Sequence, residues 1–343
     1  MNGFDEKTEI LTESGWKSYI EISSEDNFAT LNISSNKIEF QKSNNIYIHD
    51  YSGEMFYVKS QGVDMIVTSN HRLYFKHFSK SYKIGKADSI NLEAKSRITF
   101  RASGTMNNKE YDKITDDELR ICAWIHTDGH INKKSKLPSY SIYQRKSKVH
   151  LITEILEKLE YKYSIKYRDR DIKSICGKTL KKKPDISCHI TILRGKMAKS
   201  QKGEFHRLDS LISQKYVLPK WVYELSDRQF TIFLSSLIDG DGSRHPYHPE
   251  TSWMLYGMKN FLDQVHMACV IHGYRSSISE YRKNTWRLNI NKTDVICVDP
   301  KNRNKIEEYN GKVFCVTVPN STVIVRRNGK VHISGSCLNE NVN

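Results

Sequence analysis

The sequence has no apolar run approaching the roughly 20 residues that a helix needs to cross a bilayer. Its first residues also lack the basic flank and apolar stretch of a secretory signal peptide. Seven cysteines are an odd number, lie far apart, and include no Cys-x-x-Cys pair with zinc-site spacing. These absences argue against a membrane span, a disulfide-stapled secreted domain and a structural zinc site. We therefore expect a soluble cytoplasmic protein in a reducing compartment, with no membrane partner.

The 343 residues carry a strong excess of positive charge. Lysine and arginine number 54 against 39 aspartates and glutamates, which gives a formal net charge of +15. A polyanion is the natural partner of such a chain, although a basic surface without a partner would have the same composition. The length predicts about two domains of roughly 150 residues each.

The N-terminal segment, up to about residue 92, has the pattern of a compact all-β unit. Apolar and polar residues alternate over 29–33, 37–40 and 55–58, with turn-forming residues at 34–36 and at 52–53. A strand predicted over 64–67 is followed by Thr68-Ser69-Asn70-His71. A lone histidine after a strand is more often a solvated or hydrogen-bonded loop residue, so this Thr-x-x-His pattern is weak evidence by itself.

The C-terminal segment, from about residue 310, is also predicted to be β. Residues 311–320 and 322–332 read as two strands, the second interrupted by an Asn-Gly turn. This segment contains Cys315 and His332 and ends in Ser334-Gly335-Ser336-Cys337. For Cys315 alone, an ordinary buried cysteine on a strand is the better interpretation.

The middle of the chain contains an internal repeat. Two apolar stretches that are rich in small residues, 121–129 and 234–242, both end in Asp-Gly. A capping-box pattern precedes each of them, at 115–118 and 226–229, and predicts a helix start. The order that follows each Asp-Gly is the same: a strand over 140–143 or 253–256, a helix with an apolar stripe over 151–159 or 261–269, and further strands over 165–168 or 276–292.

Together these motifs resemble an intein that contains a two-repeat LAGLIDADG homing endonuclease of phage or bacterial type. Gly3-Phe4-Asp5 and Thr68-x-x-His71 match the N-terminal splicing motifs, Cys315 and 322–332 match the C-terminal ones, and the Asp-Gly stretches match the endonuclease motif. The resemblance implies a multidomain fold, in which an all-β Hint (horseshoe) splicing domain is split by an inserted α+β endonuclease of two pseudo-symmetric αββαββα-like repeats. The implied segments are 1–100 and 296–336 for the splicing domain, 101–295 for the endonuclease with repeats at about 113–215 and 224–295, and 337–343 for a remnant of the downstream flank.

Two aspartates at the ends of two close helices form a candidate metal site. Small residues at 122–123 and 235–236 would let the helices approach and bring Asp128 and Asp241 side by side. Two like charges are costly there unless divalent cations lie between them. The resemblance implies Mg²⁺, for which Mn²⁺ would substitute, and metal-assisted cleavage of both DNA strands. The predicted metal-binding residues are Asp128, Asp241, Gly129 and Gly242.

Lysines are the other predicted catalytic groups. Lys215 matches a basic motif of the family ahead of the second helix, where a lysine contacts the attacking water or the phosphate. Lys292, at the end of the last strand of the second repeat, is the candidate for the symmetric role. Lys220 would replace Lys215 if the motif were shifted. On composition alone each would be an ordinary surface lysine; the motif favours the functional role for Lys215, and for Lys292 only marginally.

DNA contacts are expected from the polar faces of the strands. Around 286–291, apolar residues alternate with polar ones, so one face can pack while the other reads base edges. A merely solvated polar face would show the same alternation. The predicted DNA-binding residues are Lys166, Arg168, Arg170, His189, Thr191, Arg282, Arg287, Asn289 and Asn291, and Lys181, Lys182 and Lys183 are expected to contact phosphates.

The resemblance further predicts that this chain does not splice. The family's first residue is normally a nucleophilic cysteine where this chain has Gly3, and its last is normally an asparagine where this chain has Ser336. A serine hydroxyl cannot form the succinimide that releases the C-terminal junction. Thr68, His71, Cys315 and His332 would then be vestigial, and Cys337 would be an unused downstream nucleophile.

We therefore expect a monomeric endonuclease that cuts a long specific site in double-stranded DNA, in the host gene that lacks the insertion. Two other interpretations stay open. One is a sequence-specific DNA-binding remnant without cleavage activity, and the other is an RNA-binding splicing helper, known for relatives of this nuclease fold.

Overall fold

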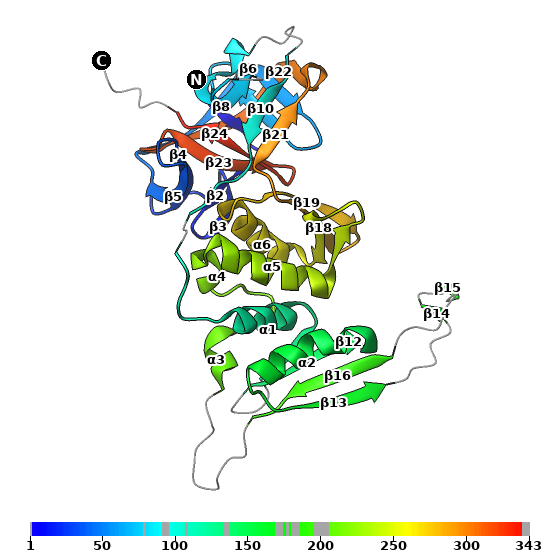
Figure 1. The fold of residues 1–343 in the computed structure, drawn as a ribbon. Coiled ribbons are helices and arrows are strands. Elements are labelled where there is room, and N and C mark those ends of the chain that lie inside the picture. The colour runs from blue at the N-terminus through cyan, green and yellow to red at the C-terminus, as the bar shows by residue number, and fades with distance from the viewer. Residues whose placement is uncertain are drawn as a thin grey trace. The chain divides into compact units, whose positions relative to one another are not determined.

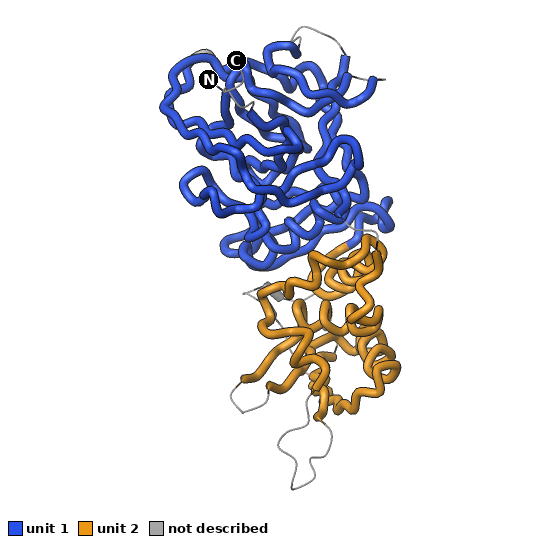
Figure 2. The backbone as a smooth tube through the Cα atoms, turned by 90° about the vertical axis from the view of Figure 1, so that its left-hand side faces the viewer, with its two compact units in different colours: residues 1–108, 244–343 blue, residues 109–243 orange. Residues whose placement is uncertain are grey.

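The computed structural model of the chain describes residues 2–77, 80–90, 96–106, 109–133, 138–168, 174–175, 178–179, 186–194 and 206–337. The chain divides into two compact units, unit 1 with Met1–Asn108 and Arg244–Asn343 and unit 2 with Lys109–Ser243 (Figure 2). Across the described residues, none of the helices is long and apolar enough to cross a membrane. The predicted domain boundaries stay a prediction, because the compact units follow packing and assign the strands after residue 243 to unit 1.

Unit 1 is predominantly β (Figure 1). Its elements are β1 (Phe4–Asp5), β2 (Thr8–Thr12), β3 (Gly15–Ser18), β4 (Asn27–Asn32), β5 (Lys37–Lys42), β6 (Asn45–Lys59), β7 (Asp64–Thr68), β8 (Arg72–His77), β9 (Lys83–Lys86), η1 (Ala87–Ser89), β10 (Ile98–Arg101), β18 (His248–Gly257), α6 (Lys259–Ile271), β19 (Arg275–Arg282), β20 (Thr285–Asn291), β21 (Val295–Val298), η3 (Pro300–Asn302), β22 (Arg303–Thr317), β23 (Thr322–Arg327) and β24 (Lys330–Gly335). The strand β17 (Gly242–His245) crosses the boundary between the units.

A closed barrel of β1, β22, β6 and β7 joins the two ends of the chain. Here the turn predicted at 52–53 is wrong, because β6 continues through it. The partner strand β22 pairs with β6 from Asn45 opposite Thr317 to Val58 opposite Arg303, with a register shift between Ile306 and Tyr309. Gly53 takes a φ of +151° within the strand, a value that a glycine adopts without strain. The residue therefore allows an irregular strand and does not form a turn.

A second sheet of unit 1 runs in the order β18-β20-β19-β24-β23-β2-β4-β5, with β3 paired to β2 (Figure 1). The predicted Asn-Gly turn is confirmed: Asn328 and Gly329 both have positive φ, 47° and 74°, as a tight hairpin between β23 and β24 requires. The tip of this hairpin reaches β19, where the Ile278 amide donates to the Gly329 carbonyl at 3.0 Å. Strands of the predicted splicing domain and of the second repeat therefore share one sheet.

Unit 2 combines helices with a four-stranded sheet in the order β11-β12-β16-β13. Its elements are α1 (Asp116–Thr127), β11 (Gly129–Asn132), β12 (Ser139–Arg145), η2 (Lys146–Lys148), α2 (Val149–Lys158), β13 (Tyr163–Arg168), β14 (Ser174–Ile175), β15 (Lys178–Thr179), β16 (Ser187–Ile192), α3 (Arg207–Leu211), α4 (Trp221–Glu224) and α5 (Asp227–Asp241). The order α1-β11-β12-α2-β13-β16-α3 agrees with the predicted repeat pattern, with the short β14-β15 hairpin added.

Local sequence signals set the helix ends. The hydroxyl of Thr115 accepts from the Glu118 amide and that of Ser226 from the Gln229 amide, and the N3 side chains reach back to the cap amides. Both predicted capping boxes are thus present. The helix α6 ends just before Gly273, whose φ of +86° stops it as the sequence predicts.

Candidate functional sites

The two predicted aspartates lie at the C-terminal ends of α1 and α5, which pack against each other. Asp128 caps α1, and Asp241 is the last residue of α5. A Cβ atom added at Gly240 would lie 2.2 Å from Thr127 Oγ1 and 3.0 Å from Asp128 Oδ2. Only a residue without a side chain allows this approach, so Gly240 fixes how closely the two helix ends meet.

The electrostatics of this pair are those of crowded like charges. Burial, followed by the negative charge of Asp241, raises the pKa of Asp128 to about 7. Asp241 is exposed to solvent as a residue. The protein atoms around its carboxyl still remove part of the water from it, and this desolvation raises its pKa as well. The positive charges of Lys215 and Lys148 oppose both shifts. The four charged groups of unit 2 thus interact with one another: Asp128, Asp241, Lys148 and Lys215.

Lys148, and Gln144 as a further member of this group, were not predicted from the sequence. The Gln144 amide donates to Asp128 Oδ2 at 2.9 Å, and the Lys148 ammonium donates to the Asp239 carbonyl at 2.6 Å. Gln144 lies on β12 and Lys148 ends the short helix η2, so the fold of the first repeat carries both to the helix ends. Its position just before the predicted helix over 151–159 is the signal that could have pointed to Lys148.

His126 supports the predicted Lys215. The ring of His126 is buried, and burial lowers its pKa to about 4. The neutral ring can therefore donate from Nδ1 to the Lys215 carbonyl, and the two atoms are hydrogen-bonded. His126 stands where the resembled motif often has an aspartate, and here it positions the segment that carries Lys215.

The remaining predicted catalytic and metal-binding residues are placed as follows. Gly129 is buried at the start of β11, and Gly242 donates its amide to the Ile238 carbonyl as the cap of α5. Lys220 is exposed at the start of α4. Lys292 follows β20 in unit 1 and is also exposed.

The donor set of the aspartate pair fits a hard divalent cation. Carboxylate and carbonyl oxygens are the ligands that Mg²⁺ takes in proteins, usually with several waters retained. The raised pKa of Asp128 supports this fit between the carboxylates and a cation. Two neighbouring carboxyl groups do not both ionise readily at pH 7 unless a positive charge lies between them. Asp128 and Asp241 would hold the ion.

The first-repeat sheet presents a polar face. In the strand register, His189 lies between Tyr143 of β12 and Lys166 of β13. The His189 ring stacks on the Tyr143 ring, with the two ring centroids 4.4 Å apart. Thr191 and Arg168 belong to the same face, while Ile142, Ile190 and Ile192 are buried behind it. Arg170 and Lys181 to Lys183, also predicted to contact DNA, lie outside the described residues.

The second-repeat sheet has a matching polar face in unit 1. Arg287, Asn289 and Asn291 alternate with the buried Leu288 and Ile290 on β20. They line a concave surface that encloses about 850 Å³. Other residues of this surface were not predicted from the sequence. They include His245 at the end of β17, Arg275 of β19, and Asn302 and Lys330 of the predicted splicing domain. Arg282 is exposed at the end of β19, over the Tyr281 ring.

The N-terminal splicing motif is also assembled in unit 1. The Gly3 amide donates to Thr68 Oγ1 at 3.0 Å, and the Thr68 amide donates to the Gly3 carbonyl at the same distance. A Cβ atom at Gly3 would lie 2.9 Å from Val313 Cβ. Glycine therefore fits this position, and a cysteine there would need its neighbours to shift.

The other splicing-motif residues gather around this junction. Burial lowers the pKa of His71 to about 3 and that of His332 to about 4, so both rings are neutral at pH 7. His71 Nε2 lies 3.3 Å from Ser334 Oγ, and the Ser336 amide donates to the Ser321 carbonyl at 2.9 Å. Cys337 Sγ lies 3.8 Å from the Asn2 carbonyl oxygen.

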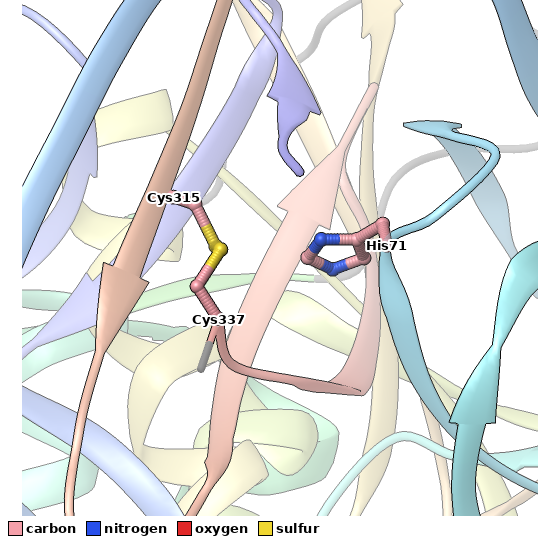
Figure 3. A group of neighbouring side chains, drawn as sticks. All are labelled: His71, Cys315 and Cys337. Atoms are coloured by element: carbon pink, nitrogen blue, oxygen red, sulfur yellow. A yellow bond between two sulfur atoms is a disulfide. The ribbon is translucent and has the colours of Figure 1, made fainter. Parts of the chain in front are cut away.

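Cys315 and Cys337 form a disulfide, which the sequence did not predict (Figure 3). The two residues are 22 positions apart, and the return of β24 past β22 brings them together. The sequence argued only against a disulfide-stapled secreted domain and for a reducing compartment, so this single pair was not foreseen. Scattered spacing could not reveal a pairing that depends on strand topology.

No family model matches the chain. Among curated proteins it is 24% identical over 392 residues to a DNA-directed RNA polymerase subunit beta section of Stigeoclonium helveticum, covering 94% of this chain and 35% of that protein. It is 22% identical to a ribonucleoside-diphosphate reductase subunit beta of Aquifex aeolicus, covering 97% and 50%. A third relative, 25% identical, is the Clp protease proteolytic subunit of Chlamydomonas moewusii, covering 68% and 24%. The chain thus spans a quarter to a half of the length of these relatives.

Similar solved structures include inteins and a homing endonuclease. One is a class 3 split intein in a glutathione-linked, splice-inactive variant, with a TM-score of 0.34 and 8% identity, covering 98% of this chain and 99% of that one. Another is the homing endonuclease I-WcaI bound to its DNA recognition sequence, with a TM-score of 0.35 and 16% identity, covering 52% and 76%. TM-scores of this size do not by themselves establish a shared fold.

Proposed function

We propose that the chain is an intein-type insertion whose middle segment is a Mg²⁺-dependent endonuclease for a long, specific site in double-stranded DNA. The observation that carries this proposal is the meeting of Asp128 and Asp241 at two packed helix ends, with Lys148 and Lys215 interacting with both. Perturbed acids grouped with bases are typical of a catalytic site.

Each residue then has a distinct task. Asp128 and Asp241 hold the divalent ion, which supplies charge stabilisation for the attacking and leaving oxygens when it is bound. The ammonium groups of Lys148 and Lys215 offset the negative charge of a phosphate near the carboxylates. Gln144 orients the Asp128 carboxyl through its 2.9 Å hydrogen bond.

The two polar sheet faces support duplex DNA as the substrate. The face with Lys166, Arg168 and His189 and the concave surface with Arg287 and Asn289 each combine cations with groups that can read base edges. A net charge of +15 favours association with phosphates.

The experiment is cleavage of a randomised duplex library with Mg²⁺, followed by sequencing of the cut ends. We expect one long preferred site, and Asp128→Asn with Asp241→Asn should abolish cleavage while leaving binding in place. Replacing Asp50, an exposed residue of β6, by Asn is the matched control and should cut normally.

The alternative is a DNA-binding remnant without cleavage. If the wild-type chain binds a specific duplex and never cuts it with Mg²⁺ or Mn²⁺, this alternative holds and the endonuclease proposal fails. Preference for RNA over duplex DNA in competition would favour the splicing-helper interpretation instead.

We also propose that the chain does not splice, because Gly3 and Ser336 lack the reacting groups of the resembled chemistry. The tight surroundings of Gly3 support this, since a side chain there would meet Val313. Incubation with a thiol followed by intact-mass measurement tests it. The mass should change by no more than the two hydrogens gained when the Cys315–Cys337 disulfide is reduced, and a fragment lacking residues 337–343 would refute the proposal.

The curated relatives support an inserted element. Alignments cover 94% and 97% of this chain yet at most half of a polymerase subunit or a reductase subunit. These two proteins have unrelated named activities, so the segment that they share with this chain is separable from either activity. A self-contained insertion accounts for such a distribution.

A further inference from the structure

The turn that joins β17 to β18 presents an unusually exposed aromatic side chain. Only Pro246 and Tyr247 connect these two strands, which are neighbours in the sheet. Tyr247 is 84% exposed, the largest value among the large hydrophobic side chains of the described residues. Residues 248–251 are exposed as well, and β20 pairs with β18 only from Ser252 onward. The end of the β17–β18 hairpin therefore extends beyond β20.

The turn itself does not require a tyrosine. Two-residue hairpin turns favour glycine, asparagine and aspartate, because these residues adopt positive φ with little strain. Tyr247 is not among the described residues with a positive φ, so its side chain is not selected by backbone geometry. The side chain does not fill a core either, because it is exposed. Its flat ring is therefore available to a partner.

Two histidines hold this ring in a small aromatic cluster. The Tyr247 amide donates to His245 Nδ1 at 3.3 Å. The centroid of the His245 ring lies 6.0 Å from that of Tyr247 and 5.3 Å from that of His248, on which it stacks at an interplanar angle of 20°. A single exposed tyrosine would be ordinary. Three grouped rings are typical of an interaction surface, because rings already held in place lose little entropy when a partner binds.

The place of the cluster indicates nucleic acid as its partner. His245 lines the concave surface that also contains Arg287 and Asn289, two of the residues predicted to contact DNA. His248 lies on the same side of β18 as Ser252, because side chains alternate along a strand, and Ser252 lines that surface too. A duplex bound on the concave surface would therefore pass the hairpin tip that carries Tyr247.

We propose that the Tyr247 ring stacks on a nucleobase at the edge of the duplex site bound by the concave surface, and that it partly opens one base step there. This inference rests on the proposed function, because it needs a specific duplex on that surface. Side chains that enter between base pairs unstack them and kink the duplex. Every base has a flat face, so this contact adds affinity and local distortion, while groups such as Arg287 and Asn289 read base identity.

The test uses a duplex selected from a random library by binding to the full chain in EDTA, so that the site is known whether or not it is cut. The fluorescent base 2-aminopurine, placed at one position of this duplex after another, reports changes in local stacking. Binding of the unsubstituted chain should change the fluorescence at least twofold at one step. Tyr247→Ala should remove that change, and Tyr247→Phe should retain it.

Affinity for the same duplex, measured by fluorescence anisotropy, gives a second readout. Tyr247→Ala should weaken binding by about tenfold, the loss typical of one base–aromatic stack. The slope of log Kd against log salt concentration should not change, because no phosphate contact is removed. Ile20→Ala is the matched control, since Ile20 is 75% exposed in a turn of unit 1 and does not line the concave surface. It should bind as the wild type does.

The outcomes separate this inference from the proposed function. If the full chain binds no duplex more tightly than a scrambled one, the proposed function fails and the stacking role fails with it. If the chain binds a specific duplex but no position of 2-aminopurine changes its fluorescence, duplex recognition stands and the stacking role is overturned. This scan needs no variant, so it decides the question even if Tyr247→Ala does not fold. A shallower salt slope in Tyr247→Ala would also overturn stacking, because it would assign the tip to a phosphate contact.

Discussion

The carboxyl of Asp128 carries the clearest mark of a special environment. Burial and the nearby charge of Asp241 raise its pKa to about 7, and Gln144 holds one of its oxygens. An acid in such surroundings changes its charge near neutral pH and not near pH 4. Its protonation is therefore linked both to folding and to cation binding.

Without metal, the protein should lose stability as the pH rises from about 4 to about 7. The folded state binds more protons than the unfolded state between the ordinary pKa of an aspartate and about 7. The stabilisation is thus present below that range and lost as the pH rises through it. Melting temperatures in EDTA measure this slope. Asp128→Asn should flatten it and Asp50→Asn should not, and equal slopes for wild type and Asp128→Asn would be contrary to the expectation.

Lys148→Met should reduce the cleavage rate by roughly 100-fold, as does loss of other preorganised charged or hydrogen-bonding groups. Its positive charge opposes the raised pKa of Asp128. Removing it should also move the acid limb of the pH-rate profile to higher pH, whereas Lys148→Arg should keep that limb in place. Lys158→Met, on the exposed last turn of α2, is the control. An unshifted acid limb in Lys148→Met would count against the assigned role.

Part of this group could be predicted from the sequence. Asp128, Asp241 and Lys215 stand at motif positions, so the pattern alone singled them out. Gln144 and His126 act through contacts that depend on strand register and on the loop before α4, which no local pattern encodes. The pairing of Cys315 with Cys337 likewise depends on how distant strands meet.

At the scale of the elements, the helix pair α1 and α5 is the structure that brings the two aspartates together. Small residues at 122–123 and 235–236 were expected at the crossing, and Cys122, Ala123 and Ser236 are buried. The tightest approach is made by Gly240, within the Asp-Gly-Asp-Gly end of α5. Backbone proximity, and not side-chain packing alone, sets the geometry of the site.

Gly240→Ala should destabilise the protein by about 2 kcal/mol, the usual cost of an overpacked contact. Its methyl group would meet Thr127 Oγ1 at 2.2 Å. Urea unfolding measures the change. Gly257→Ala is the control, since its methyl group would have no neighbour closer than 3.7 Å. A stability equal to that of the control would mean that the helix ends have room to separate.

The elements themselves were predictable where the signal is local. The capping boxes, the glycine stop of α6 and the Asn-Gly hairpin each depend on a few adjacent residues. The full length of strand β6 could not be predicted. Its partner β22 lies more than 200 positions away, and pairing with it outweighs the turn preference of Ser52 and Gly53. Long-range pairing decides such cases.

At the scale of the whole molecule, an ion network around a buried arginine joins the predicted second repeat to the predicted splicing domain within unit 1. Arg326 of β23 is almost fully buried. It pairs with Glu9 of β2 at 2.6 Å and with Asp263 of α6 at 2.5 Å, and its guanidinium lies over the Trp16 ring. The Arg326 side chain thus connects β23 with β2 and α6, which lie far apart in the sequence.

Arg326→Met should destabilise unit 1 by about 3 kcal/mol, because it leaves Glu9 and Asp263 without their shared cation. Chemical denaturation followed by circular dichroism measures the loss. The control is Arg97→Met, whose exposed pair with Asp299 should contribute less than about 1 kcal/mol. A loss no larger than that of the control would show that the network is dispensable.

The contact between β24 and β19 limits where the chain can be shortened. Removing 101–295 would take β19 away from the Asn328-Gly329 hairpin and leave its Gly329 carbonyl without the Ile278 amide. The exposed backbone would become an open sheet edge, on which other chains can add a strand and aggregate. Removing only unit 2 would leave β19 in place beside the hairpin and keep that edge paired. A shortened form of the predicted splicing domain should therefore retain the strands β18, β19 and β20.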